Sequence, residues 1–143
     1  PLTMYLICEP TYPGFKPNAD VLIRDEHTVQ YRSEGYMSAH WIHNGKAIFT
    51  PADGLAVLSA VNIGTMNAMT FAHPHSHGEG IEEVWTLVEG RELELIGKQI
   101  RWLETGTAFM VPPTGYTPHA HINPGENLSK FLLFARWRDE TKR

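Results

Sequence analysis

The sequence AHPHSHGEGIEEVWTLVEG, residues 72–90, decides the fold of this chain. Three of the eight histidines, His73, His75 and His77, stand here on alternate positions, and three acids follow within six residues. Because alternate residues of an extended strand share a face, these imidazoles can converge on one point. Imidazole nitrogens with a carboxylate nearby bind first-row transition metals, so this stretch predicts part of a metal site.

A second histidine cluster, PHAHIN, follows at residues 118–123. On a strand, His119, His121 and Asn123 share a face. Three predicted strands separate this cluster from the first one. If both clusters line the interior of one barrel, their side chains can meet at a single ion, about 2.0–2.2 Å from each ligand atom.

Length and composition describe one globular domain of modest charge. A chain of 143 residues can bury a core large enough to fold without disulfides. The net charge of −4, with no run of basic residues, argues against nucleic acid and anionic membranes as partners. The single cysteine, Cys8, excludes an intrachain disulfide and a cysteine-rich metal cluster, and we expect it to be buried.

No apolar run approaches the roughly 18 residues that span a bilayer, so no membrane partner is expected. The apolar residues 2–8 are too few for a signal peptide and follow no basic segment, so the predicted location is cytoplasmic. Pro1 can follow an excised initiator methionine, or the chain can be the remainder of a longer one.

Short apolar stretches punctuated by glycine and proline predict an all-β domain. The pair Asn44-Gly45 predicts a two-residue hairpin turn. We interpret residues 1–143 as a single domain, with a core barrel at about 55–137 and an N-terminal extension of short strands and loops at 1–54. The predicted strands are residues 4–8, 21–24, 28–32, 46–50, 55–63, 65–77, 83–89, 92–96, 99–103, 107–111, 119–123 and 129–137.

The first cluster resembles the first motif of the cupins. That motif has a His-x-His pair, a few residues, a Glu, six residues and a Gly. This chain has His75, His77, Glu83 and Gly90. The gap before Glu83 is one residue longer than usual, and its glycines allow a bulged loop to absorb the insertion.

The second cluster resembles the second cupin motif, which starts with Gly, passes a loop of Pro and Gly, and ends in His followed four positions later by Asn. Here these are Gly106, residues 112–115, His119 and Asn123, with a longer loop before His119. The resemblance covers roughly residues 64–134, about half the chain.

The resemblance implies a double-stranded β-helix, or jelly-roll barrel, of the cupin type. It also implies a divalent transition metal held by His75, His77, Glu83 and His119. Glu79 and Glu82 stay open as alternatives to Glu83. Strand alternation favours Glu83 only weakly, because both faces of this strand are partly apolar, and its distance from Gly90 in the motif favours it more.

Other residues have expected places around this site. His121 should lie beside His119 on the inner face, where it can position a substrate or move a proton. Tyr116, in the long loop over the site, is the candidate lid residue, and His73 faces inward if the strand stays extended through Pro74. Asn123 is interpreted as a supporting or turn-fixing amide. Residues expected to line the barrel are Trp85, Phe71, Met69, Leu93 and Leu95, and His27, His40 and His43 are interpreted as surface residues.

Together these features favour a metal-dependent enzyme that acts on a small polar molecule in the barrel interior: a dioxygenase, or a lyase or isomerase on a sugar or keto-acid type substrate. Ligand types do not separate Fe, Mn, Zn and Ni. The alternative is a non-catalytic small-molecule binding or sensing module that uses the same metal pocket. A third interpretation is half of a two-barrel protein. The resemblance also implies a homodimer, in which residues 4–8 can add an edge strand to a neighbour.

Overall fold

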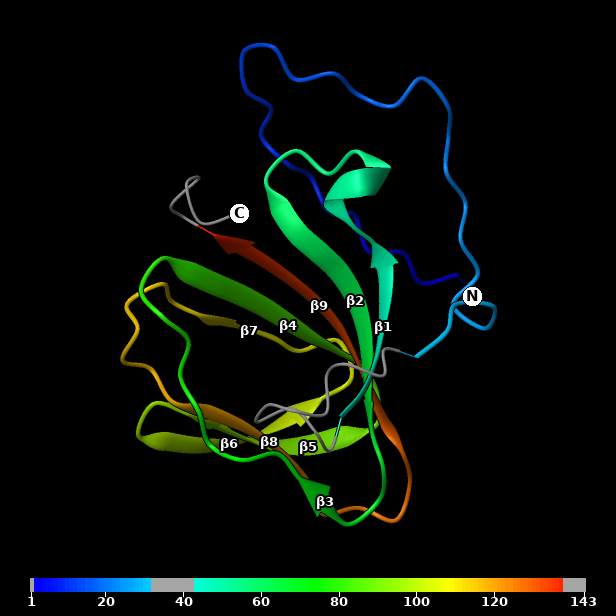
Figure 1. Ribbon diagram of the computed structural model, residues 1–143. Helices are drawn as coiled ribbons and strands as arrows, with labels where there is room; N and C mark the ends of the chain where they lie inside the picture. Colours follow the sequence, from blue (N-terminus) through cyan, green and yellow to red (C-terminus); the bar gives the residue numbers. More distant parts are fainter. Residues whose placement is uncertain (1, 32–42, 138–143) are drawn as a thin grey trace.

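The computed structural model describes residues 2–31 and 43–137, which form two antiparallel sheets that face each other (Figure 1). The five-stranded sheet has the order β1 (His43–Phe49), β2 (Leu58–Met66), β9 (Ser129–Trp137), β4 (Ile81–Glu89) and β7 (Ala108–Val111). The four-stranded sheet has the order β3 (Thr70–Phe71), β8 (His119–Asn123), β5 (Arg91–Ile96) and β6 (Gln99–Glu104). A short 3-10 helix, η2 (Pro51–Asp53), links β1 to β2.

From β3 onward the chain crosses repeatedly between the two sheets. Strands β4, β7 and β9 join the five-stranded sheet, and β5, β6 and β8 join the four-stranded one. This alternation makes a double-stranded β-helix and confirms the predicted all-β jelly roll. The apolar core between the sheets is formed by Met66, Trp85, Leu87, Leu103, Val111 and Phe131. Among the described residues, no helix is long and apolar enough to cross a membrane.

Strand β5 presents its acids to the interior and its leucines to the outside. Glu92 and Glu94 are fully buried, whereas Leu93 and Leu95 are only partly covered. The prediction that these two leucines line the barrel is therefore wrong. Their register partners on β6 are the exposed Trp102 and Ile100, so apolar side chains gather on the outer face of the four-stranded sheet.

Three other burial predictions are also wrong. Met69 is 74% exposed in a turn, where its φ of 57° is left-handed, and Phe71 is 55% exposed on the outer side of the short strand β3. Cys8 is exposed because the N-terminal segment lies on the surface. Trp85, in contrast, is buried in the core as predicted.

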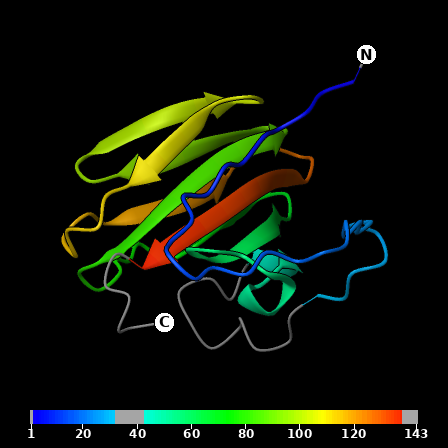
Figure 2. The same cartoon turned by 90° about the horizontal axis from the view of Figure 1, so that it is seen from above.

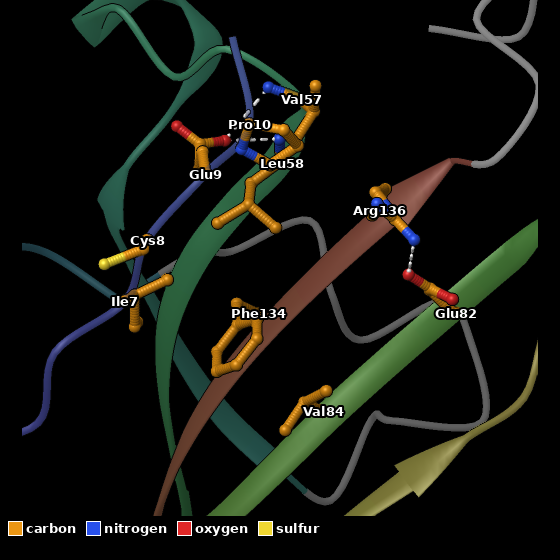
Figure 3. Close-up of a pocket in the computed structure, with 10 residues that line it drawn as sticks. All are labelled: Ile7, Cys8, Glu9, Pro10, Val57, Leu58, Glu82, Val84, Phe134 and Arg136. Atoms are coloured by element: carbon orange, nitrogen blue, oxygen red, sulfur yellow. Dashed lines mark hydrogen bonds and ion pairs between the residues drawn. The ribbon is translucent and has the colours of Figure 1, made fainter.

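The N-terminal segment is held by one carboxylate instead of a strand ladder. Within the described residues 2–31 there is no strand, so the strands predicted at 4–8 and 21–24 are wrong, and so is the described part, residues 28–31, of the strand predicted at 28–32. Residues 2–10 run across the outer side of the five-stranded sheet (Figure 2). The carboxylate of Glu9 accepts hydrogen bonds from the backbone N–H groups of Ala56, Val57 and Leu58, at 2.9, 3.0 and 2.6 Å. Figure 3 shows Glu9 beside Val57 and Leu58.

Strand β1 replaces the predicted hairpin turn. Asn44 and Gly45 lie inside this strand, where their backbones pair with Thr65 and Gly64 of β2. The Asn-Gly signal is local, and the long-range ladder with β2 outweighs it. The five-stranded sheet therefore begins before residue 55, with an N-terminal strand that extends it.

Candidate metal centre

Backbone pairing fixes the first two histidines of the site against the third. His75 lies between β3 and β4, in the stretch that crosses from the four-stranded to the five-stranded sheet (Figure 1). An isolated bridge joins it to His119 at the start of β8, with the N–H of each residue 2.9–3.1 Å from the carbonyl oxygen of the other. Alternation then places His77 on the same side as His75, as the sequence predicts.

The three imidazoles surround one point. Ring centroids are 4.3 Å apart for His75 and His119, 5.0 Å for His75 and His77, and 5.1 Å for His77 and His119. One possible ligand atom from each ring lies within 4.8 Å of those of the other two. His119 is fully buried, whereas His75 and His77 are half-buried. The point between the three rings therefore lies just inside the barrel, and its solvent-facing side is formed by His75 and His77.

A carboxylate from the opposite sheet completes the group. Glu83 lies on β4, and its Oε2 is 3.0 Å from Nε2 of His77 and 3.5 Å from Nε2 of His119. The indole Nε1–H of Trp85 donates to the same oxygen at 3.0 Å. Burial by itself would raise the pKa of Glu83, but the hydrogen bonds from His119, His77 and Trp85 hold it well below its usual range. The ionised form is the one that binds a cation.

The protonation of His75 also suits metal binding. Its Nδ1 lies 3.0 Å from the carbonyl oxygen of His73, which can only accept, so Nδ1 carries the proton and Nε2 has the lone pair. Burial lowers the pKa of His75, with further lowering from the neighbouring His119, so the ring is neutral at pH 7. Three imidazole nitrogens and one ionised carboxylate are a donor set that divalent transition metals accept.

No protein-family model matches this sequence, and no curated protein matches it. Solved structures do match the fold. The polyketide cyclase RemF from Streptomyces resistomycificus has a TM-score of 0.67 at 14% identity, over 84% of this chain and 81% of that one. A sugar phosphate isomerase of the cupin superfamily from Silicibacter pomeroyi has a TM-score of 0.65 at 15% identity, over 78% and 73%.

This chain has the cupin fold. A third match, with a TM-score of 0.58 at 17% identity over 68% of this chain and 99% of that one, is the cupin domain of a transcriptional regulator of the XRE family from Enterobacter cloacae. At these identities the likeness concerns the fold alone, and any activity has to be argued from the site.

The fold also distinguishes between the three acids that are candidates for the carboxylate ligand. Glu83 points between the sheets, while the carboxylate of Glu82 lies on the outer face of β4, in an ion pair with Arg136 (Figure 3). Glu79 is exposed in the loop before β4. Of the three, the geometry brings Glu83 to the histidines.

The other predicted site residues lie at different depths. His121 is fully buried, and its ring centroid is 6.3 Å from that of His119. Tyr116 is 85% exposed in the loop between β7 and β8. His73 is exposed, so the expectation that it faces inward is wrong: its carbonyl oxygen, and not its ring, supports the site. His27 is exposed as predicted, while His40 and the side chain of His43 lie outside the described residues.

Asn123 fixes a turn, which is one of the two roles expected of it. Its side-chain amide donates to the carbonyl oxygens of Met66, Asn67 and Asn127, at 2.9–3.3 Å. Its Oδ1 accepts from the N–H of Gly125 at 3.0 Å. One side chain therefore ties the end of β2 to the turn between β8 and β9.

A second group of potential ligands was missed by the sequence analysis. Glu92, Glu94 and His121 offer ligand atoms that all lie within 4.8 Å of one another, and all three residues are buried. The available signal was the alternation of acids with leucines in residues 92–95. Acidic and apolar residues alternate there, so they lie on opposite faces of the strand. The usual rule that charged residues face solvent therefore predicted that the leucines, and not the acids, would be buried.

Proposed function

We propose that this cupin holds a divalent transition metal through His75, His77, Glu83 and His119 and is a metal-dependent enzyme acting on a small polar molecule. The observation that carries the proposal is the position of the Glu83 carboxylate, whose Oε2 is 3.0 Å from Nε2 of His77 in the connection before β4 and 3.5 Å from Nε2 of His119 in the other sheet. The low pKa of Glu83 and the proton on Nδ1 of His75 give these groups the forms that a cation requires.

Four protein ligands leave one or two positions of an ion open for a small ligand. An ion of this class, when bound, polarises a carbonyl as a Lewis acid or supports oxygen chemistry on a chelating substrate. We therefore propose a lyase or isomerase on a sugar or keto-acid type substrate, or a dioxygenase. The half-buried His75 and His77 form the side from which such a molecule can approach.

His121 is the proposed proton-transfer residue. Its Nδ1 shares a hydrogen bond with Oε1 of Glu94, which orients the ring. Burial lowers the pKa of His121 well below its usual value, and the neighbouring His119 lowers it further, so the ring is neutral and can accept a proton. Tyr116 stays a predicted lid residue. It is exposed, and its loop would have to close over the site to bring the ring to a substrate.

Replacement of His121 by Phe tests the catalytic role. We expect turnover of a substrate, found by screening sugar acids, keto acids and amino-acid derivatives, to fall by at least about 100-fold. The occupancy of the first site by metal should stay at the wild-type value, because His121 is not one of the four ligands of that site. His73→Phe is the matched control, since His73 is exposed, and should keep full activity. Unchanged turnover in His121→Phe would contradict the proposed role.

The second candidate is a non-catalytic binding or sensing module that uses the same metal pocket. One observation favours it: His121 is enclosed by Trp85 and Phe131, with ring centroids at 4.2 and 4.7 Å, and has no exposed surface for contact with a substrate. Calorimetry separates the two functions, because a sensing module binds its ligand in the metal-loaded protein without converting it.

The homodimer stays a prediction, which sedimentation of the purified protein would test.

A further inference from the structure

Behind the first site, the barrel encloses a second group of metal-ligand residues. Glu92 and Glu94 project inward from β5, and His121 projects inward from β8, where its backbone pairs with that of Glu94. The side chains of all three are completely buried. This group shares strand β8 with the first site but none of the four proposed ligands.

Two oxygens of this group receive no hydrogen bond from a backbone, hydroxyl or imidazole donor. Nδ1 of His121 shares a hydrogen bond with Oε1 of Glu94, and Ser129 donates through its hydroxyl to Oε1 of Glu92. The Oε2 atoms of both carboxyl groups are buried with no such donor among the described residues, and the two carboxyl groups hydrogen-bond to each other. Buried polar atoms nearly always have a partner, so these two oxygens call for an explanation.

The carboxyl groups also lack a compensating charge. Within the described part of the chain, their ion-pair partner is His121 alone, with Nδ1 at 4.0 Å from Oε2 of Glu92. Burial raises the pKa of Glu92 to about 8 and that of Glu94 to about 9, and the nearby Glu94 contributes to the shift of Glu92. Two carboxyl groups in a dry interior stay protonated when no cation lies between them, and a bound cation favours the ionised form of both.

We propose that Glu92, Glu94 and His121 form a second divalent-cation site inside the barrel, separate from the first. Their ligand atoms lie within 4.8 Å of one another. Two atoms bound to one ion at about 2.0–2.2 Å can be no more than about 4.4 Å apart, so only a small closure of these side chains is required. Two carboxylate oxygens and one imidazole nitrogen suit Mn²⁺ or Fe²⁺.

The surroundings support an ion better than an organic ligand. The group is enclosed on all sides, and a bare ion needs no space beyond the centre of its own ligands. Ser129 orients the carboxyl group of Glu92, and the rings of Trp85 and Phe131 hold the imidazole of His121. Neighbours that fix the orientation of a ligand are the usual support of a metal site.

Titration with MnCl₂ tests the second site without reference to any activity. Free Mn²⁺ is measured by its EPR signal for the wild type, Glu92→Gln/Glu94→Gln and His75→Ala/His77→Ala, with circular dichroism to confirm folding. We expect two manganese ions per chain for the wild type and one for each variant. The control, Glu89→Gln/Glu126→Gln, removes two exposed acids and should keep two ions.

The outcomes separate the second site from the first. A folded Glu92→Gln/Glu94→Gln protein that binds as many ions as the wild type would overturn the second site. If instead His75→Ala/His77→Ala binds as many ions as the wild type and the Gln variant binds one fewer, the second site is supported and the first contradicted. Should the double Gln variant fail to fold, Glu94→Gln alone, which keeps the Ser129–Glu92 hydrogen bond, is measured in its place.

Discussion

Glu82 and Glu83 are neighbours in the sequence, but their carboxylates lie on opposite faces of the five-stranded sheet. The carboxylate of Glu83 accepts the indole N–H of Trp85 and lies beside His77, whereas that of Glu82 pairs with Arg136 on the outside. The difference follows from strand alternation alone. At the scale of single residues, a shift of one position in the register of β4 would exchange the two roles.

The two buried acids of β5 predict how the stability of the metal-free protein depends on pH. The folded state keeps Glu92 and Glu94 protonated up to about pH 8 and 9, whereas the unfolded chain releases these protons near about pH 4.3. Between these values the folded state binds more protons, so stability falls as pH rises, by at most about 1.4 kcal/mol per pH unit for each carboxyl group. His121 is the titratable group that faces both acids, and burial lowers its pKa well below its usual value.

Urea unfolding of chelator-treated protein between pH 5 and pH 9 measures this dependence. Glu92→Gln/Glu94→Gln should have a flatter profile and higher stability than the wild type at pH 8, because glutamine carries no charge to bury. Parallel profiles for the two proteins would mean that the acids are solvated or compensated in the folded state.

How far the site could be predicted depended on the kind of residue. The histidines of the first site followed from alternation, because a His-x-His pair places both rings on one face whichever face that is. The acids of β5 could not be placed, because alternation alone does not say whether Glu92 or Leu93 faces inward. That choice depends on β6 and β8, because Trp102 of β6 pairs with Leu93 on the outer face and His121 of β8 pairs with Glu94 in the interior.

At the scale of elements, the N-terminal segment depends on Glu9. Its carboxylate accepts three backbone N–H groups at residues 56–58, where the chain enters β2. Ile7 and Cys8 then lie beside Leu58 and Phe134, over the outer side of the sheet (Figure 3). The sequence could not predict this contact, because it joins residues almost fifty positions apart through one side chain.

Substitution of Glu9 by Gln should therefore destabilise the protein. A glutamine amide has one acceptor oxygen in place of two, and the loss of charged hydrogen bonds to backbone donors is expected to cost about 1–3 kcal/mol of unfolding free energy. Urea denaturation measures the change, with Glu126→Gln as an exposed control that should alter stability by less than about 0.5 kcal/mol. Equal stability of Glu9→Gln and the control would show that the tether contributes nothing.

The Asn44-Gly45 pair shows that a local turn signal can give a wrong prediction. Two residues that favour a hairpin turn lie within β1 because their backbones complete a ladder with β2. Gly97 and Gly106, by contrast, lie in turns between the later strands, with positive φ values of 61° and 90°, and no other strand pairs with them. Turn-forming residues predict the local backbone conformation correctly where no distant strand pairs with the same residues.

At the scale of the whole molecule, the first site exists only when both sheets are in place. Glu83 belongs to the five-stranded sheet, and His119 belongs to the four-stranded one. The cupin fold brings these residues together from two motifs separated by β5, β6 and β7. A metal bound at this point joins the two sheets and should stabilise the folded state in proportion to its affinity.

Elemental analysis of protein purified without a histidine tag tests the central claim most directly. The comparison is between the wild type and His75→Ala/His77→Ala, with His73→Ala as a control that removes an exposed histidine of the same stretch. We expect the double variant to contain one transition-metal ion per chain fewer than the wild type, and the control to match the wild type. A wild-type content below about a tenth of an ion per chain, or equal contents in the wild type and the double variant, would contradict the proposed metal centre.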